Sequence, residues 1–355
     1  MRVSVIPALE LDPTLMKRWS EIQASDTALR SPFYSCGFTR QVAQSGQPVR
    51  VAVIESGGVV SGFFPHQAGR LGHLHPVGGG FNDYHGLIAL PNPELTASAL
   101  LKACDGRYLG FNHLPLTQTV FSPFVRLQSV SPVLELSGGW GAYVQRLCLA
   151  QGTQSPGILS TLRASLKRIE RDLGPVRFQM REKSPALLHV LMRMKSEQSI
   201  RTKSSAGDPF SEGWIRQLLG SALASEEDGI GASLSTLHAG DTLLALHYGL
   251  QSGDTLHSWF PVFDPTYAYY QPGLVLLKKI IETSCEAGHT LIDLGRGTAG
   301  YKMRFKTSVV HLGEGAVSRP AVVAQTVMTK NLWKAKIKAN PWVDQLRSWA
   351  KPEGK

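Results

Sequence analysis

Candidate chemical groups gather in the segment between residues 231 and 305. His257 lies there in a run of strand-forming residues. An imidazole has an ordinary pKa of about 6.5, which suits removal of a proton from a hydroxyl or an amine near neutral pH. A histidine that only completes the packing of a sheet fits the same position, so both interpretations stay open. If His257 is functional, its residue type indicates general base catalysis.

A turn made of Gln271, Pro272 and Gly273 leads directly into a run of helical periodicity, residues 274–287. The first N–H groups of a helix have no partner and carry partial positive charge, which suits a pyrophosphate. An ordinary turn with proline at a helix start is the alternative. The strand break at Asp264-Pro265 before the turn and the crossover after it favour the phosphate interpretation. One helix start contributes only about 0.3–1 kcal/mol, so other contacts must add to it.

Charged side chains near this segment each allow a functional and a structural interpretation. Asp293 ends a short apolar strand, where it could orient or deprotonate a substrate. An ion pair with Lys302 or a loop cap is the structural alternative for this carboxylate. Lys195, Arg201 and Lys302 are candidates for holding an anionic acceptor, and a solvated helix end is the alternative for Lys195 and Arg201.

The elements that must position these groups follow from hydrophobic spacing and turn residues. We predict, in order, strands at 230–237, 243–250 and 255–262, a helix at 274–287, a strand at 289–294 and a helix at 301–305. Tight turns join the three strands into an antiparallel meander. A strand–helix–strand crossover of this length implies parallel pairing of its strands. If the second turn sets a simple register, Tyr248 faces His257 and His247 faces Ser258.

The N-terminal half repeats this order of elements. We predict a helix at 13–24, strands at 49–55, 59–64 and 84–90, a helix at 93–103 and a strand at 107–112. We interpret the two halves as copies of one α/β fold, with the linker at Gln151–Gly157. The predicted domains are residues 1–150, 151–318 and a tail, 319–355. In the first copy Leu90-Pro-Asn-Pro93 replaces the glycine turn, so only the second copy is expected to hold a nucleotide cofactor.

Composition narrows the class of protein. With 355 residues, 43% hydrophobic and 18% charged, the chain suits two globular domains. Its net charge of +10 favours anionic partners. Its four cysteines have no CxxC spacing, which argues against a zinc site or a disulfide framework and, with no apparent signal peptide or membrane span, favours the cytoplasm. No metal is expected.

The tail has a composition of its own. Residues 321–355 hold seven Lys or Arg against two Asp or Glu, interleaved with Trp333, Trp342 and Trp349. Such a segment suits peripheral contact with an anionic membrane or a partner. Packing of the tail on the body of the protein is the alternative that we favour.

Several segments resemble GNAT-superfamily acetyltransferases of the CelD/BcsL type, which are associated with cellulose and polysaccharide biosynthesis. The similar motifs are Ser31-Pro-Phe33, Asn82-Asp-Tyr-His-Gly86, Met194–Lys203, His257–Asp264, Gln271-Pro-Gly273, Asp293–Gly297 and Tyr301-Lys302. The resemblance covers roughly residues 5–318. It implies an α/β protein of two tandem GNAT-like (acyl-CoA N-acyltransferase) domains with mixed, mainly antiparallel sheets.

The resemblance also implies an activity. An acyl group, most simply acetyl, would pass from acetyl-CoA or another acyl-CoA to an amine or hydroxyl of a saccharide precursor, with no DNA partner. The residues implied in binding the cofactor are Trp259, Phe260, Pro261, Val262, Gln271, Pro272, Gly273 and Leu274. Tyr301 would protonate the departing thiolate, with His257 as the base and Asp293 orienting or deprotonating the substrate. Core packing is the alternative for Tyr301. The glutamate that GNAT enzymes often use as a base has no counterpart on these strands.

Two other functions remain open. The Asp–Gly–(Tyr/Phe)-Lys ending also occurs in Fem peptidyltransferases, which use aminoacyl-tRNA, and the positive charge suits tRNA. A binding module that kept the fold and lost the chemistry would also lack the glutamate.

Overall fold

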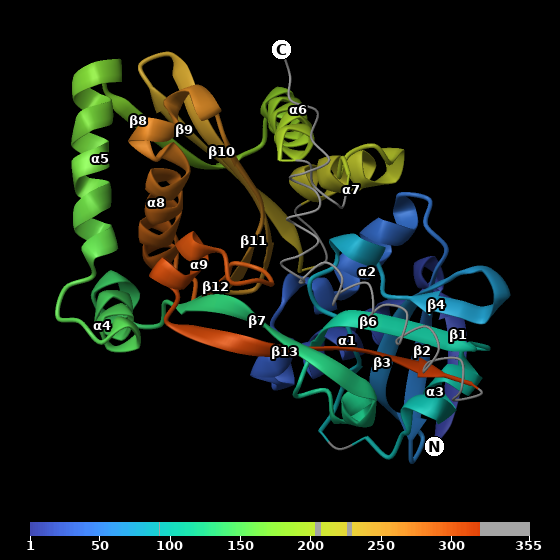
Figure 1. Cartoon of the computed structure of the whole chain (residues 1–355). Coiled ribbons are helices and arrows are strands. Elements are labelled where there is room, and N and C mark those ends of the chain that lie inside the picture. The colour runs from blue at the N-terminus through green and yellow to red at the C-terminus, as the bar shows by residue number, and fades with distance from the viewer. Residues whose placement is uncertain (92, 203–206, 226–228, 320–355) are drawn as a thin grey trace, which may run out of the picture.

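The computed structural model describes residues 1–91, 93–202, 207–225 and 229–319 (Figure 1). It is a mixed α/β structure built on one large sheet. The strands are β1 Arg2–Pro7, β2 Val49–Ser56, β3 Val59–Ala68, β4 His73–His75, β5 Ile88–Ala89, β6 Tyr108–Pro115, β7 Val125–Glu135, β8 Val176–Glu182, β9 Gly231–Ala239, β10 Thr242–Ser252, β11 Thr255–Phe263, β12 Leu291–Asp293 and β13 Ser308–Ser318.

Nine α-helices lie in the described part of the chain. They are α1 Pro13–Ser25, α2 Cys36–Gln44, α3 Ala97–Ala103, α4 Gly139–Gln151, α5 Gly157–Leu173, α6 Pro185–Arg201, α7 Gly213–Ala224, α8 Pro272–Glu286 and α9 Gly300–Phe305. The C-terminal elements agree with the sequence prediction. The tail at 321–355 lies outside the described residues.

The order of the strands confirms the predicted repeat. Across the sheet the order is β1-β2-β3-β4-β6-β13-β7-β12-β11-β10-β9-β8, with β5 beside β3. In the first half β2, β3 and β4 form an antiparallel meander, α3 follows, and β6 pairs parallel to β4. In the second half β9, β10 and β11 form the meander, α8 follows, and β12 pairs parallel to β11. The sheet is therefore mixed and mainly antiparallel, as predicted.

The two halves exchange their last strands. β13, from the second half, lies between β6 and β7, and β7, from the first half, pairs with β12. Figure 1 shows β7 and β13 side by side across the middle of the molecule. The sheet is continuous, so the division into domains at residue 150 stays a prediction.

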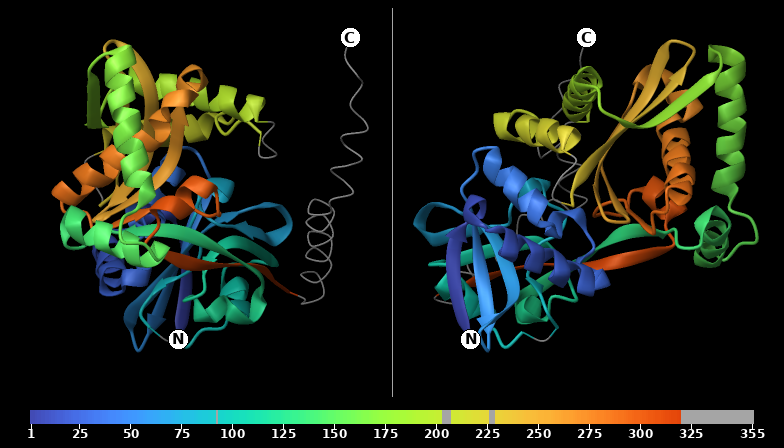
Figure 2. Two further views of the ribbon diagram at one scale, coloured as in Figure 1. Left: turned by 60° about the vertical axis from the view of Figure 1, so that its left-hand side comes forward. Right: turned by 180° about the vertical axis from the view of Figure 1, so that it is seen from behind.

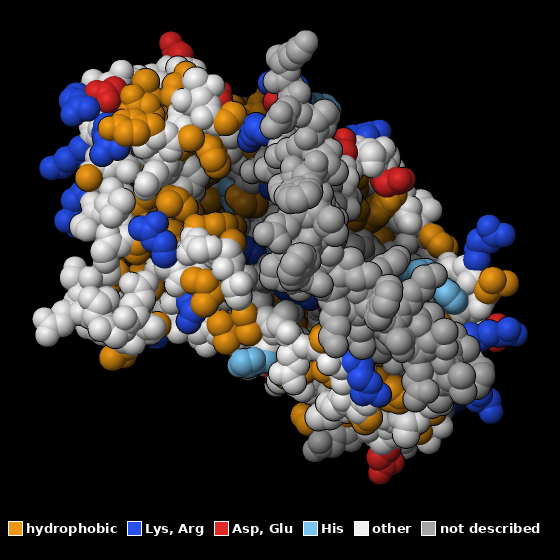
Figure 3. Space-filling model, in the orientation of Figure 1, with side chains coloured by type: hydrophobic (Ala, Val, Ile, Leu, Met, Phe, Trp, Pro, Cys, Tyr) orange, Lys and Arg blue, Asp and Glu red, His pale blue; other side chains and the backbone are white. Residues whose placement is uncertain are grey.

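Helices cover the C-terminal strands on both faces. Figures 1 and 2 show α5 and α8 on one side of β9–β11, with α6 and α7 on the other. On the α7 side, one core joins α1, α2, β2 and β3 of the first half to α6, α7 and β9–β11 of the second. Basic side chains of α5 line an exposed edge of the molecule (Figure 3). That edge is a solvated helix face.

Two predictions about the strands are wrong in detail. His257 pairs with Leu250 and not with Tyr248, because the hairpin closes with Ser252 opposite Thr255. Beyond Ser258, Trp259 is an extra residue that shifts the register again, so Tyr248 pairs with Phe260. In the first half only Ile88–Ala89 of the predicted strand 84–90 is a strand. The residues before β5 form a loop whose backbone is bonded by side chains. The helix predicted at 93–103 begins at Ala97, after the capping side chain of Thr96.

Candidate active site

The site lies where β11 and β12 separate. β12 pairs with β11 only from Thr255 to His257 and ends at Asp293, whereas β11 continues to Phe263. Beyond His257, that edge of β11 therefore faces space and not a strand. Two cavities occupy the region.

The first cavity, which we name the α8 cavity, has a volume of about 410 Å³. Gln271, Pro272, Gly273 and Leu274 line it at the start of α8, and apolar side chains of the same helix continue the wall. The helix starts there because Gln271 takes a left-handed conformation, with φ of 54°, and Pro272 fits the first turn. The N-terminal N–H groups of α8 thus border a cavity with a largely apolar wall.

The second cavity, which we name the Asp83 cavity, has a volume of about 490 Å³. It is lined by Asp83, His113, Lys195, Ser258, Trp259, Pro261, Leu294, Gly295, Arg296, Gly297, Tyr301 and Lys302. Lys195, Ser258, Pro261 and Tyr301 line both cavities. The two cavities therefore meet at these four residues.

A buried carboxylate–imidazole pair forms one wall of the Asp83 cavity. His257 Nε2 donates to Asp83 Oδ2 at 2.8 Å, and His113 Nε2 lies 3.3 Å from Asp83 Oδ1. Burial opposes ionisation of Asp83. The hydrogen bond from His257, together with positive charge on His257, His113 and Lys302, outweighs it and lowers the pKa of Asp83. The His257 side chain is fully buried, whereas 21% of the Asp83 side chain is exposed, so Asp83 stands between His257 and the cavity.

Behind His257 lies Asp293, whose Oδ1 is 3.8 Å from His257 Nδ1. Asp293 Oδ1 accepts from Ser131 Oγ at 2.6 Å and from Gly295 N at 2.8 Å, and Oδ2 accepts from the Tyr84 hydroxyl. Burial and the neighbouring Asp293 raise the pKa of Tyr84 well above its usual value, so its hydroxyl stays a donor. Of the two structural roles predicted for Asp293, the loop cap is the one present.

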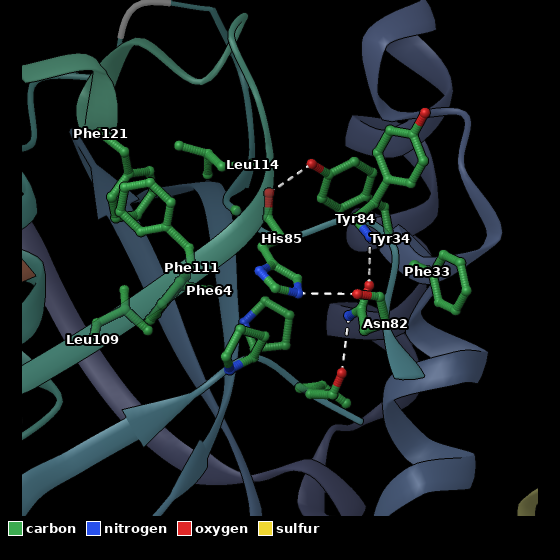
Figure 4. A pocket seen from close by; sticks show the side chains of 14 residues that line it. Phe33, Tyr34, Phe64, Asn82, Tyr84, His85, Leu109, Phe111, Leu114 and Phe121 are labelled. Atoms are coloured by element: carbon green, nitrogen blue, oxygen red, sulfur yellow. Dashed lines mark hydrogen bonds between the residues drawn. The ribbon is translucent and has the colours of Figure 1, made fainter. Parts of the chain in front are cut away.

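The loop that carries Asp83 is fixed by buried hydrogen bonds (Figure 4). Asn82 donates from Nδ2 to the carbonyl of Val77 at 2.9 Å and accepts the Tyr84 N–H at 2.7 Å. The hydroxyl of Tyr34 donates to the His85 carbonyl at 2.8 Å. These bonds stiffen the chain on both sides of Asp83. The carboxylate is thus positioned before any ligand arrives.

Two lysines form another part of the wall. Lys195 Nζ donates to the Pro261 carbonyl at 3.0 Å, and Lys302 Nζ donates to the carbonyls of Gly295 and Arg296, each at 3.0 Å. Burial and the charge of Lys302 lower the pKa of Lys195 to about 8, and burial lowers the pKa of Lys302.

Ser258 and Tyr301 lie at the junction of the cavities. His247 Nε2 is 2.9 Å from Ser258 Oγ, and burial with the nearby charges of His257 and Lys195 lowers the pKa of His247 to about 3. His247 is therefore neutral near pH 7. Burial raises the pKa of Tyr301, whose phenol stays protonated and able to donate.

Some of the other predicted site residues line a cavity and some do not. Pro261 and Val262 line the α8 cavity and Trp259 lines the Asp83 cavity, but Phe260 packs into the core against Phe210, at 5.2 Å between ring centroids. Arg201 is exposed at the end of α6 and lines neither cavity.

Sequence reasoning did not assign Asp83, His113 or Ser258 to the site. The Asn-Asp-Tyr-His-Gly motif at 82–86 was the available signal for Asp83, and no pattern marked His113. Among the described residues, no group of three or more His, Cys, Asp or Glu is arranged for a metal ion. In the same part of the chain, no helix is long and apolar enough to span a bilayer.

Comparison with known protein families finds one similarity in the second half of the chain. Residues 158–303 match the family model described as acetyltransferase (GNAT) domain. This stretch is similar to GNAT domains. It contains β11, α8, β12 and part of α9, and hence most of both cavity walls. Asp83 and His113 lie outside it, so the first half of the chain completes the site. A search of curated proteins finds no match.

Solved structures with similar folds extend over nearly the whole chain. FemX has a TM-score of 0.57 at 9% identity, covering 89% of this chain and 96% of FemX. The C-terminal domain of a putative lysylphosphatidylglycerol synthetase from Agrobacterium fabrum has a TM-score of 0.54 at 15% identity, covering 89% and 95%. A tandem GNAT protein from the clavulanic acid biosynthesis pathway has a TM-score of 0.50 at 11% identity, covering 89% and 98%. At these identities the similarity establishes the fold, a tandem GNAT arrangement.

Proposed function

We propose that this protein transfers an acyl group, most simply acetyl, from acyl-CoA to an amine or hydroxyl of a small acceptor. The observation that carries the proposal is the meeting of two cavities at Lys195, Ser258, Pro261 and Tyr301. One cavity borders the start of a helix inside the GNAT domain, and the other borders an ionised carboxylate. A saccharide precursor in cytoplasmic polysaccharide synthesis is the acceptor that the CelD/BcsL resemblance suggests.

In this proposal the α8 cavity takes the acyl-CoA. The N–H group of Gly273 binds the pyrophosphate, because a helix start offers unpaired donors and positive potential. The N–H of Leu274 already donates to the Gln271 carbonyl at 3.0 Å, so Leu274 contributes to the cavity wall. The pantetheine follows the free edge of β11 from Val262 toward Trp259. The thioester then lies near Ser258, where a backbone N–H or the serine hydroxyl can polarise its carbonyl.

The base acts as a pair. His257 is fully buried with Nε2 bonded to Asp83, so it does not reach an acceptor directly. Asp83 faces the cavity and accepts the hydrogen bond of the attacking amine or hydroxyl, while His257 holds that carboxylate and shares the proton. Asp293 positions His257 from behind, at 3.8 Å from Nδ1.

The reaction balances with residues of this site. The attacking nitrogen or oxygen forms a bond to the thioester carbon, and the carbon–sulfur bond breaks. The Asp83–His257 pair receives the acceptor's proton, and Tyr301 donates its phenolic proton to the leaving thiolate. An amine that enters as an ammonium ion releases one net proton to solvent.

Calorimetry tests the donor. Acetyl-CoA, longer acyl-CoAs and charged tRNA are titrated into the full-length protein. We expect one acyl-CoA per chain, because α3, the counterpart of α8 in the first half, begins after Thr96 and not at a glycine-containing turn. A stoichiometry of two would mean that the first half also binds CoA. Tight, strongly salt-dependent binding of charged tRNA without acyl-CoA binding would reject the proposal in favour of a Fem-like transferase.

A further inference from the structure

Two lysines of the Asp83 cavity are half-buried and lie in no ion pair with another described residue. Lys195 and Lys302 are bonded only to backbone carbonyls, and within the described residues neither forms an ion pair with a carboxylate. Burial lowers the pKa of both lysines, and the charge of Lys302 lowers the pKa of Lys195 further. Buried cations in proteins are ordinarily paired, because desolvation of an unpaired charge is costly. Two such ammonium groups on one cavity wall suit an anionic ligand.

The opposite charge faces them across the same cavity. Asp83 is ionised, and its two contacts are imidazoles and not a lysine or arginine. Arg296 also lines the cavity, but its guanidinium is already bonded to Glu314 at 3.0 Å and to the Asn112 carbonyl at 2.9 Å. The positive charge of Arg296 is thus already paired with a carboxylate of the protein.

A glycine keeps the space between carboxylate and ammonium open. A Cβ on Gly295 would lie 3.0 Å from Asp83 Oδ2 and 3.7 Å from Lys302 Nζ. The two side chains approach one point but form no ion pair with each other. A small ligand with a charge of each sign would bridge them.

From this arrangement we infer that the acceptor is zwitterionic, with its amine at Asp83 and a carboxylate or phosphate at Lys195 and Lys302. The inference rests on the proposed function and narrows it to N-acylation of an amino compound that carries an anionic group. A neutral sugar acceptor would leave the ammonium groups of both lysines without an anionic ligand. The anion of the acceptor and the phosphates of CoA are separated by place, since Lys302 lines only the Asp83 cavity.

Ligand-observed NMR titration of the full-length protein tests the inference without requiring turnover. One set of ligands is 2-aminoethyl phosphate, ethanolamine and ethyl phosphate, and the other is β-alanine, propylamine and propionate. In at least one set we expect the zwitterion to bind about tenfold or more tightly than either singly charged analogue, because each added charge makes a charge-assisted hydrogen bond. The set with the larger preference identifies phosphate or carboxylate as the anion.

Three substitutions assign the preference to residues. Asp83→Asn should lower the affinity for the zwitterion to the affinity for the singly charged anion. Lys302→Met should lower it to the affinity for the singly charged amine. Lys195→Met serves the same purpose if Lys302→Met lowers the melting temperature. Lys167→Met, which changes an exposed lysine of α5, should leave the preference intact.

Equal binding of zwitterion and single-charge analogues in both sets, no binding of either zwitterion, or a preference that survives both lysine substitutions would overturn the inference. These outcomes are distinct from failure of the proposed function. If the protein binds acetyl-CoA but does not prefer zwitterions, the proposed acyltransferase function stands and the zwitterionic acceptor is rejected. If the protein prefers zwitterions but does not bind acyl-CoA, the zwitterion site stands and the acyltransferase function is rejected.

Discussion

His257 and Asp83 are 174 residues apart in sequence, yet His257 Nε2 donates to Asp83 Oδ2 at 2.8 Å. His257 lies in the stretch that matches the GNAT family model, and Asp83 lies in a loop of the first half. Because Asp83 is the partner that faces the cavity, the first half supplies part of the site and is not only a degenerate copy. A GNAT domain without the first half would lack this carboxylate.

Replacing Asp83 with asparagine should lower kcat by about 10²–10⁴-fold, the usual contribution of a positioned general base. The amide keeps the shape but cannot take a proton. Steady-state release of the CoA thiol measures the effect, and the melting temperature checks the fold. Asp241→Asn, at an exposed turn between β9 and β10, is the matched control. Full activity in Asp83→Asn would remove this residue from the mechanism.

Replacing Gly273 with valine should weaken acetyl-CoA binding by about tenfold or more, equivalent to at least about 1.4 kcal/mol. A Cβ at this position would already lie 3.3 Å from Phe263 Cδ1, so a branched side chain must displace the helix start or fill the cavity. Calorimetry measures the affinity. Gly141→Val in α4, where a Cβ meets no atom within 4 Å, should bind normally. Unchanged affinity in Gly273→Val would reject the assignment of the cofactor site.

We expect substitution of Asp293 to lower the stability of the fold, because this residue acts as a structural acceptor. Asp293→Ala leaves the buried donors of Tyr84, Ser131 and Gly295 without their acceptor, which should cost about 3–5 kcal/mol of unfolding free energy. Urea denaturation measures it. Adding Tyr84→Phe and Ser131→Ala removes two of the donors and should restore part of the loss. If Asp293→Ala melts like the wild type but is inactive, Asp293 is catalytic and not a positioning residue.

Three buried histidines should make the protein sensitive to mild acid. Burial is the main cause that lowers the pKa of His66 to about 4 and those of His85 and His247 to about 3. Below pH 6.5 the unfolded chain takes up protons that the folded chain refuses, so stability falls as pH drops toward 4. Each such proton changes the unfolding free energy by about 1.4 kcal/mol per pH unit.

Urea denaturation across this pH range tests that dependence. His66 lies away from both cavities, and His66→Leu should reduce the slope by about one proton. An unchanged slope would show that His66 titrates in the folded protein.

Binding of an anion at the Asp83 cavity should weaken above pH 8. The pKa of Lys195 is lowered to about 8, so its ammonium charge is lost as pH rises through that value. Titration of 2-aminoethyl phosphate from about pH 6.5 to 9 should show the decline, and Lys195→Met should be weaker throughout and flatter. A wild-type affinity independent of pH would exclude Lys195 from the anion site.

The fold could be predicted from sequence where signals are local. The meander, the proline at the start of α8 and the crossover to β12 each depend on residues close in the chain. The register of β10 against β11 could not, because it depends on where the hairpin closes, with Ser252 opposite Thr255, and on the extra residue Trp259. His257 was identified by type alone. Its partner Asp83 was missed because contacts between distant segments leave no periodic pattern in the sequence. The prediction of a strand at 84–90, directly after Asp83, also hid the loop, since only Ile88–Ala89 is a strand.

The exchange of β7 and β13 has a consequence for synthesis of the chain. While the ribosome makes residues 136–307, β6 and β7 have no β13 between them, and each carries an open hydrogen-bonding edge. The first half cannot close its sheet during translation, although almost all of its residues have left the ribosome. Closure waits for residues 308–318 and depends on contacts of long sequence separation, which form slowly. A nascent chain halted before residue 308 would therefore expose strand edges to chaperones and to other copies of itself.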